Sequence, residues 1–559
     1  MSMNLVLGVD FGSESVRTVV VDCDSGKTLA ADFCVYPRFA QELYCDSSIN
    51  QFRQHPLDYL ETFEKCIKKA LGKLSNKAGQ SVRGISVDAT GSTPCPVDID
   101  GTPLALLPQF SENPNAMFYL WKDHTAIEEA LEITKVFSDC NGEDYTRFQG
   151  AYSSEWFWAK ILYASRVDPI IKQYAYSWVE HCDWIPALLT GNLKPESMYR
   201  SSCAAGHKVL WHSDFGGLPA RACFSRIDSY LAKVADTYKG PPQPSDTKVG
   251  IITKEWAKKL GISEQAVIGG SSLDAHAGAV GAGIKQGTLV KVLGTSTVDM
   301  LIERRENLRG NDLKDCCGQA EDSIVPGYVG IEAGQAAFGD VYSWFRRLLL
   351  QPITAMVEKS TYIADGDKKC FLQECYETVL SELDKAAMAE PCSEDLIIVD
   401  WFNGRRYPII NESVKGGIYG LSLGTDTAML YKALVLSTIF GSRRIFDCFI
   451  SRGIAIDDVI IVGGIAKKSA FVGQLLADIL KRPVKVSGTE EACAKGAAIY
   501  ASVACGAFSS ITEAQKHLCD NFEKIFMPND TKSPIYDKLY KQYLNFGRHI
   551  EQMENEIEK

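Results

Sequence analysis

The stretch Asp274–Gly283 has the sequence DAHAGAVGAG, which places one carboxylate ahead of a run of small residues near the middle of the chain. The preceding segment 267–273, VIGGSSL, predicts a short buried strand that runs into a loop. A carboxylate at that point can act as a general base on a substrate hydroxyl. The alternative is an Asp that caps a helix beginning at Ala275. Two similar glycine turns, one on each side of the stretch, favour the general base.

The N-terminal turn lies in residues 5–22, LVLGVDFGSESVRTVVVD, which predict a strand, a tight turn and a second strand. Backbone amides of a Gly/Ser turn can form an anion-binding concavity, and Asp10 at the strand end can hold the magnesium that accompanies a nucleotide. A surface hairpin without function can have the same sequence pattern. This motif by itself is therefore weak.

The second turn lies in residues 289–302, LVKVLGTSTVDMLI, with the same order of strand, glycine-hydroxyl turn and strand. A chain that begins two halves with the same hairpin is expected to form two similar α/β domains that face a central cleft. Two such turns could hold the phosphates of one nucleotide from opposite sides. Chance recurrence of a short pattern is the alternative.

Length and composition describe a large chain of ordinary polarity. The 559 residues suggest two to four domains, and no apolar run approaches the ~20 residues that span a bilayer. Asn4–Val9 predicts a strand at the very start rather than a secretory signal. We therefore expect a cytoplasmic protein without a membrane partner.

Charge and cysteine usage narrow the function class. The formal net charge of -11 argues against a nucleic-acid partner, which would need a basic face. The 18 cysteines are scattered without CxxC pairs, which predicts reduced, mostly buried thiols. Cys95 and the adjacent Cys316 and Cys317 could be reactive, although a cysteine acting as a small hydrophobe is the commoner case.

Three segments before Asp274 could line a substrate pocket. The strand 82–88 leads into the loop 89–96, ATGSTPCP, and open α/β sheets place ligand contacts at such strand ends. The aromatic segment 113–178 could cover the faces of a polyol, or could be core. Lys208 ends a turn of small residues and could equally be a plain surface lysine.

Two segments after the second turn suit a nucleotide. Residues 329–340 form a glycine-broken segment that opens a helix. Residues 459–464, VIIVGG, predict a buried strand that ends in two glycines, where a flat base or ribose can lie on the backbone. The segment 511–559 predicts a polar amphipathic tail at the surface.

With these motifs placed, nearly the whole chain resembles the FGGY carbohydrate kinases of the actin-like ATPase (ribonuclease H-like) fold. The strings that carry the resemblance are DFGSESVR from Asp10, DATGSTP from Asp88, NPNAMFYLWKDHTA from Asn113, YSSEWFWAKIL from Tyr152, CAAGHK ending at Lys208, the Asp274 segment, GTST from Gly294, GIEAGQAAFGD from Gly330 and DWFNGRR from Asp400. Such long strings are far more specific than one glycine turn.

The resemblance implies an N-terminal kinase domain 1–284 with the sugar side and first phosphate motif, a C-terminal kinase domain 285–505 with the second phosphate and adenosine motifs, and a helical tail 506–559. It implies MgATP-dependent phosphorylation of L-ribulose to L-ribulose 5-phosphate in L-arabinose degradation. The oligomeric state stays open, with a homodimer as the form considered.

The resemblance also assigns site residues. Asp274 matches the catalytic base and also contacts the sugar, and Asp10 matches the magnesium-side carboxylate. The sugar contacts correspond to Ser92, Thr93, Cys95, Lys208 and Glu332. The nucleotide contacts correspond to Gly12, Ser13, Ser15, Arg17, Gly294, Thr295, Gly339, Gly463, Gly464 and Lys468. Where many relatives carry Asn near the adenosine, this chain has Lys468, so that contact departs from the pattern.

Two other function classes remain. Another FGGY kinase, acting on D-ribulose, xylulose or ribitol, would keep every nucleotide motif and change only residues 92–95, Lys208 and Glu332. A non-catalytic actin-fold ATPase would lack a sugar-facing base, and Asp274 argues against it.

Overall fold

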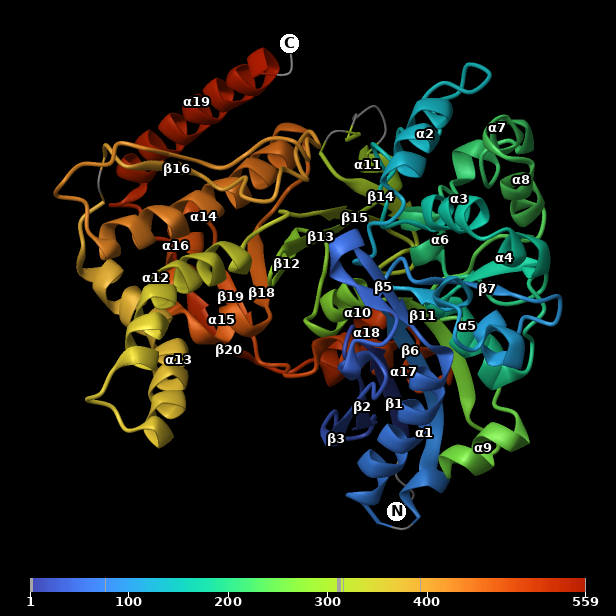
Figure 1. Cartoon of the computed structure of the whole chain (residues 1–559). Coiled ribbons are helices and arrows are strands. Elements are labelled where there is room, and N and C mark those ends of the chain that lie inside the picture. The colour runs from blue at the N-terminus through green and yellow to red at the C-terminus, as the bar shows by residue number, and fades with distance from the viewer. Residues whose placement is uncertain (1–3, 76, 309–312, 315, 393, 558–559) are drawn as a thin grey trace. The chain divides into compact units, whose positions relative to one another are not determined.

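The computed structural model describes residues 4–75, 77–308, 313–314, 316–392 and 394–557 (Figure 1). The chain forms two compact units. Unit 1 comprises Met1–Gln286, Met300–Ile331 and Gly488–Asn521, and unit 2 comprises Gly287–Asp299, Glu332–Ser487 and Phe522–Lys559. The units are therefore discontinuous in sequence, whereas the predicted domains 1–284, 285–505 and 506–559 are continuous ranges.

The chain crosses from one unit to the other after Asp299 and again after Ile331. Four elements lie at or between these two crossings. Strands β13 (Thr297–Glu303) and β15 (Val329–Ala333) each begin in one unit and end in the other. The short helix α11 (Arg305–Leu308) and strand β14 (Gly318–Glu321) lie in the part of unit 1 between them. The first crossing along the chain, from unit 1 to unit 2, follows Gln286 and is close to the predicted boundary after residue 284.

Unit 1 is built on a six-stranded sheet of order β10-β11-β6-β1-β2-β3. The strands are β1 (Leu5–Phe11), β2 (Ser15–Asp22), β3 (Thr28–Val35), β6 (Val82–Ala89), β10 (Lys248–Ile251) and β11 (Val267–Leu273). Strands β11, β6 and β1 are parallel neighbours, and β1 pairs antiparallel with β2. The carboxyl ends of three consecutive strands therefore meet at one edge of the sheet.

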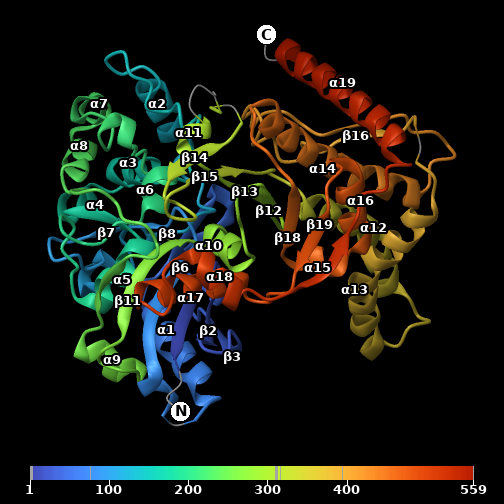
Figure 2. The same ribbon diagram turned by 180° about the vertical axis from the view of Figure 1, so that it is seen from behind.

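Helices cover the sheet of unit 1. They are α1 (Pro56–Gly72), α5 (His181–Thr190), α9 (Lys254–Leu260), α10 (Asp274–Gly281), α17 (Ala492–Ala504) and α18 (Ile511–Leu518). Helix α17 lies against β1, β6 and β11, although more than 200 residues separate it from the last of these strands (Figure 2). This long-range packing explains why residues 488–521 belong to unit 1.

Glycines allow α10 and α17 to pack backbone against backbone. A Cβ atom added at Gly281 would lie 2.0 Å from the carbonyl oxygen of Ala492, and one added at Gly496 would lie 1.8 Å from that of Ala277. Such distances are impossible for a real side chain. The small residues after Asp274 thus serve close helix packing, which was one of the two uses that the sequence suggests.

A second core in unit 1 is aromatic and helical. It includes the helices α2 (Ile127–Phe137), α3 (Phe157–Val167), α4 (Pro169–Tyr174), α7 (Arg221–Ile227) and α8 (Ser229–Ala235), with α6 (Ser202–Lys208) nearby. Short strands accompany them, namely β4 (Cys45–Asp46), β5 (Gln51–Gln54), β7 (Pro94–Val97), β8 (Phe118–Tyr119) and β9 (Ser177–Glu180). Trp158 and Trp178 are almost fully buried, so the dense aromatics of residues 113–178 largely serve packing.

The prediction of reduced cysteines is wrong for Cys140 and Cys223, and also for Cys316 and Cys448, which are disulfide-bonded. Cys140 and Cys223 form a disulfide with a Cα–Cα separation of 6.0 Å, whereas the sequence predicts reduced thiols. The two residues are 83 positions apart and meet because α7 packs against α2. Spacing along the chain carries no sign of that contact. Cys95 and Cys317 are buried, as small hydrophobes are.

Unit 2 contains four neighbouring strands in the order β12-β18-β19-β20. They are β12 (Thr288–Leu293), β18 (Asp458–Val462), β19 (Val484–Ser487) and β20 (Phe522–Phe526), of which the first three are parallel. The helices are α12 (Gly339–Lys359), α13 (Asp365–Ala389), α14 (Thr427–Ser451), α15 (Gly464–Lys468), α16 (Ala470–Leu480) and α19 (Ser533–Ile557). Unit 2 also contains a two-stranded antiparallel sheet of β16 (Ile397–Val399) and β17 (Gly417–Tyr419).

The C-terminal segment differs from the predicted helical tail. Its described part contains helices α18 and α19 as expected, but β20 lies between them and pairs with β19. Turn residues flank β20 at Asp520-Asn521 and Pro528-Asn529, but its five residues, FEKIF, show no regular alternation of apolar and polar side chains, so its pairing with β19 decides its structure. Residues 558 and 559 of that prediction lie outside the described residues.

No helix among the described residues combines the length and the apolar character that crossing a bilayer requires. The predicted fold class, α/β with two sheet-rich parts, is confirmed.

Candidate active site

Two carboxylates face each other at the carboxyl ends of the central strands of unit 1. Asp10 on β1 and Asp88 on β6 are register partners on neighbouring parallel strands, so their side chains point to the same face. Arg17 is the register partner of Asp10 on β2 and contacts it with 3.2 Å between Nη1 and Oδ2. The hairpin of residues 5–22 thus places the Asp10 carboxylate and the Arg17 guanidinium side by side.

Burial sets the electrostatics of this pair. Asp88 is fully buried and Asp10 is 3% exposed. Burial raises the pKa of Asp88 well above its usual range, and the charges of Asp10 and Asp274 raise it further. Burial also raises the pKa of Asp10, although Asp88 and Arg17 oppose that shift. The pair therefore favours a bound proton or cation over two bare negative charges.

Asp88 was not among the predicted site residues, although the sequence contained a signal for it. Asp88 is the second-last residue of β6, as Asp10 is of β1, and parallel strands bring both ends to one edge. What the sequence lacked was the pairing of β6 with β1.

Asp274 begins helix α10 directly after β11, at the same edge of the sheet. Its Oδ1 atom accepts a hydrogen bond of 2.7 Å from the backbone N–H of Ala275. The N-cap of α10 is Leu273, so Asp274 is the first helical residue rather than the cap. The side chain is half-buried, which suits a base that must reach a substrate.

The first turns of α17 reach the same edge from the C-terminal part of unit 1. Glu491, just before the helix, lies 3.5 Å from the Nε atom of Arg17. The thiol of Cys493 and the carboxylates of Asp10 and Asp88 have ligand atoms that all lie within 4.8 Å of one another. No sequence pattern connects α17 with this site.

The predicted first phosphate turn follows β1. Gly12 closes the hairpin with a backbone hydrogen bond of 3.1 Å from its N–H to the carbonyl oxygen of Ser15. Ser13 accepts a hydrogen bond of 2.8 Å from the indole N–H of Trp121, and Ser15 is buried. The turn is therefore held from both sides, as a preformed anion site needs to be.

The predicted sugar wall at residues 92–95 has its side chains turned inward. Ser92, Thr93 and Cys95 are all fully buried. The Cys95 thiol lies 3.5 Å from the carbonyl oxygen of Pro96, within the core. The hydroxyl of Ser92 donates to Glu180, so a sugar contact in this loop would involve the backbone rather than these side chains.

A buried Lys and a buried Glu hold that loop. Lys160 on α3 donates hydrogen bonds of 2.8 Å and 2.9 Å to the carbonyl oxygens of Ser92 and Leu120. Glu180 on β9 accepts from the hydroxyl of Ser92 and from the N–H of Thr93. Burial lowers the pKa of Lys160 and raises that of Glu180, while each charge opposes the shift of the other.

Lys160→Met is expected to lower the free energy of unfolding by about 3–5 kcal/mol, because it leaves the Glu180 carboxylate buried without an opposing charge. The double variant Lys160→Met/Glu180→Gln should recover part of that loss. Chemical denaturation measures both.

The matched control is Lys172→Met. Lys172 forms a half-exposed ion pair of 2.9 Å with Asp228, and its loss should cost less than about 1 kcal/mol. An equal cost for Lys160→Met and Lys172→Met would contradict the role of Lys160 as the support of the loop.

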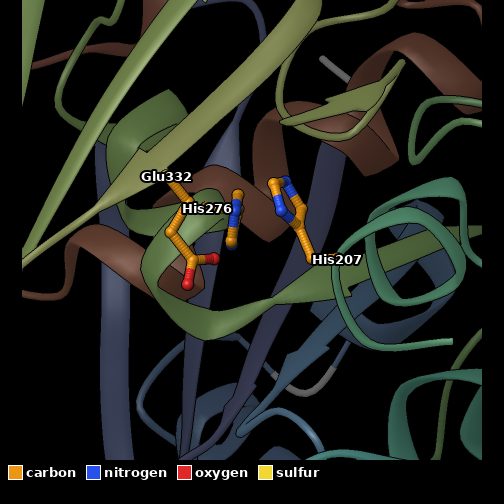
Figure 3. Close-up of side chains that lie close together, drawn as sticks. All are labelled: His207, His276 and Glu332. Carbon is orange, nitrogen blue, oxygen red and sulfur yellow. The ribbon is translucent and has the colours of Figure 1, made fainter. Parts of the chain in front are cut away.

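Lys208 is the last residue of α6 and is 5% exposed. Its ammonium group lies 5.3 Å from the centre of the Trp156 ring. The neighbouring His207 faces His276 of α10 with ring centres 4.8 Å apart (Figure 3). The end of α6 therefore lies beside the first turn of α10, which brings the predicted sugar cation to the element that carries Asp274.

Glu332, which Figure 3 also labels, is the fourth residue of β15 and the first residue of unit 2 after Ile331. Its side chain is half-buried.

The second glycine turn belongs to unit 2. Gly294 and Thr295 are exposed between β12 and β13. Gly339 begins α12, and its N–H donates to the carbonyl oxygen of Gly294 with 3.0 Å. A Cβ atom at Gly339 would lie 2.5 Å from that oxygen, so the glycine lets the start of α12 contact the turn.

The double glycine follows β18 in unit 2. Gly463 has φ +104°, a conformation that favours glycine, and precedes α15. Gly464 has no atom within 4 Å of the place a Cβ would take, so the space beside its backbone is open. Lys468 is the last residue of α15 and is exposed. These residues can accommodate a flat ring against the backbone.

Comparison with known proteins places these features in one family. Residues 289–505 match the model of the C-terminal domain of the FGGY family of carbohydrate kinases. The chain is similar to a ribulokinase of Vibrio parahaemolyticus, with 40% identity over 98% of this chain and 96% of the relative. It is also similar to a ribulokinase of Geobacillus thermodenitrificans, with 32% identity over 100% of this chain and 97% of the relative.

Solved structures agree on the fold. The structure of a xylulose kinase from Rhodospirillum rubrum matches with a TM-score of 0.77 at 18% identity, covering 98% of this chain and 99% of that one. A glycerol kinase of Plasmodium falciparum, solved with ADP, matches with a TM-score of 0.75 at 17% identity, covering 97% and 98%.

Proposed function

Since the chain belongs to the FGGY family of carbohydrate kinases, we propose that it transfers the γ-phosphoryl group of ATP to the terminal hydroxyl of L-ribulose, with Asp274 as the general base. The observation that carries this proposal is the place of Asp274, which lies at the same edge of one sheet as Asp10 and the Gly12 turn. L-Ribulose is the proposed sugar because relatives named ribulokinases match over the full chain.

Asp274 would take the proton of the attacking hydroxyl. The N–H of Ala275 holds one of its carboxylate oxygens, and the fixed backbone of α10 orients the side chain. As the first residue of α10, Asp274 lies at the positive end of the helix dipole. Lys208, at the neighbouring end of α6, is proposed to bind a sugar hydroxyl or carbonyl oxygen. These two residues would position the sugar and activate it.

The phosphate side would involve Arg17 and the Gly12 turn in unit 1. Asp10 would hold magnesium, which when bound neutralises negative charge on the transferring phosphoryl group. The fit is supported by the oxygens of Asp10 and Asp88 that receive no hydrogen bond from another donor group among the described residues. Arg17 is half-exposed beside Asp10, so its guanidinium can also meet a phosphate.

Unit 2 would bind the rest of the nucleotide. The exposed turn Gly294–Thr295 is proposed to contact phosphate, and Gly339 supports that turn from the start of α12. Gly463 and Gly464 offer open backbone for the adenosine. Lys468 is exposed at the end of the same helix and is proposed to lie beside the nucleotide.

Glu332 stays a proposed sugar contact. With ATP as phosphoryl donor, we place the reaction in the cytoplasm.

A substrate panel tests the proposal. We expect kcat/KM for L-ribulose to exceed the values for D-ribulose, L- and D-xylulose and ribitol by at least about tenfold, since buried polar groups discriminate strongly between hydroxyl arrangements. The phosphorylated product should be L-ribulose 5-phosphate. A higher value for xylulose or ribitol would assign the chain to another FGGY kinase. ATP hydrolysis without transfer to any sugar would indicate an actin-fold ATPase that is not a sugar kinase.

A further inference from the structure

Three carboxylate oxygens at the edge of the sheet in unit 1 lack a donor group as hydrogen-bond partner. Both oxygens of Asp88 and the Oδ1 atom of Asp10 are buried and receive no hydrogen bond from another donor group among the residues that the structure describes, so that only a proton held between the two carboxyls could join them. Buried carboxylates normally accept two or more hydrogen bonds, because an unpaired buried charge is costly. These oxygens therefore need either a proton that the two carboxyls share or a cation that is not part of the chain.

The local charges favour the cation. Asp10, Asp88 and Asp274 interact through their charges at this edge. Arg17 is the cationic side chain beside them, and it also contacts Glu491. The first turn of α17 adds only partial positive charge. Negative charge thus exceeds positive charge here, at a place where nucleotide phosphates would have to approach.

The distances fit a single ion. Ligand atoms of Asp10, Asp88 and Cys493 all lie within 4.8 Å of one another. Two oxygens that touch one Mg²⁺ or Mn²⁺ lie up to roughly 4–5 Å apart, about twice the metal–oxygen distance. The register of β1 with β6 fixes the two carboxylates in this relation. The sulfur of Cys493 is a soft ligand, which suits such hard ions poorly.

We propose that Asp88, together with Asp10, binds one hard divalent cation before nucleotide or sugar is present. This inference deepens the proposed function at its own site, because the cation would offset the charge that otherwise repels ATP. Asp88 is then a second cation ligand, beside Asp10, which is already proposed to hold magnesium.

Direct metal binding tests the proposal. The full chain, freed of metal with a chelator, is titrated with Mn²⁺ in the absence of nucleotide and sugar, and free Mn²⁺ is followed by electron paramagnetic resonance. We expect one tight site per chain for which Mg²⁺ competes. Asp88→Asn should weaken this site at least about tenfold. Asp10→Asn should do the same, which covers the case that one variant fails to fold.

Two control variants sharpen the result. Asp98→Asn makes the same substitution in a turn of unit 1, where the Asp98 carboxylate accepts from the N–H groups of Asp100 and Thr102. It should keep the tight site, which separates that site from weak binding by the acidic surface. Cys493→Ala should also keep it, because the thiol is not expected to bind Mn²⁺.

Two results would overturn the proposal. One is a tight site that survives in folded Asp88→Asn, and the other is the absence of any tight site in the wild-type chain, as expected if the carboxyls share a proton instead. Both differ from failure of the proposed function. A chain that phosphorylates L-ribulose but binds no Mn²⁺ alone would contradict the cation site only, whereas Mn²⁺ binding without sugar phosphorylation would contradict the sugar kinase only.

Discussion

Asp274→Asn is expected to lower kcat for phosphoryl transfer by roughly 10²-fold or more while leaving ATP binding nearly intact. The change removes the base but keeps the shape of the side chain. The amide oxygen of Asn can still accept the hydrogen bond that Asp274 receives from the N–H of Ala275. The start of helix α10 should therefore be preserved.

A coupled assay for ADP release with saturating sugar measures kcat, and calorimetry with a non-hydrolysable ATP analogue measures binding. Asp98→Asn serves as the control for the same substitution at a carboxylate that holds a turn. Near-normal turnover of Asp274→Asn would show that Asp274 is not the general base and serves only the first turn of α10.

Gly294→Val is expected to weaken MgATP binding by roughly tenfold or more, about 1.4 kcal/mol, because it would crowd the turn that we propose as a phosphate contact. The fold should tolerate the change. A Cβ at Gly294 meets only the carbonyl oxygen of Ser296, at 3.6 Å, which is ordinary contact. The melting temperature should therefore stay near that of the wild type while the Kd for the nucleotide rises.

Gly424→Val is the matched control, since Gly424 is exposed in unit 2 and a Cβ there meets only the Ser422 hydroxyl, at 3.7 Å. Gly12→Val should weaken nucleotide binding too, but its Cβ would lie 3.3 Å from the carbonyl oxygen of Ser15, so part of its effect can come from the turn itself. Wild-type affinity in folded Gly294→Val would rule out the second phosphate turn.

The sequence predicted those helices and strands whose formation depends on residues close to them in the chain. The two hairpins, the strand before Asp274 and the helix that begins at Gly339 all appear where apolar runs and glycine turns place them. Asp274 follows β11 as expected, because its place depends only on where that strand ends. Hairpins carry their own partners, so their structure is readable from one stretch of sequence.

Features that depend on distant partners could not be predicted. The pairing of β6 with β1 joins Asp88 to Asp10, and the packing of α17 brings Cys493 to them. The disulfide between Cys140 and Cys223 and the strand β20 depend on contacts of the same kind. Residues 92–95 show a further limit, because the sequence located the loop but not the inward direction of its side chains. Assembly as a homodimer stays a prediction.

The backbone contact of α10 with α17 has a consequence for protein engineering. Replacing a helical glycine by alanine commonly raises stability by roughly 0.4–1 kcal/mol, so Gly281 and Gly496 are obvious targets in a design for heat resistance. Here each added methyl group would collide with a carbonyl oxygen at about 2 Å and push the two helices apart. Because Asp274 and Cys493 lie in the first turns of these helices, that separation would displace the edge of the sheet that carries Asp10, Asp88 and the proposed base Asp274 along with the core. Thermostable variants of this chain will have to keep both glycines and gain their stability elsewhere.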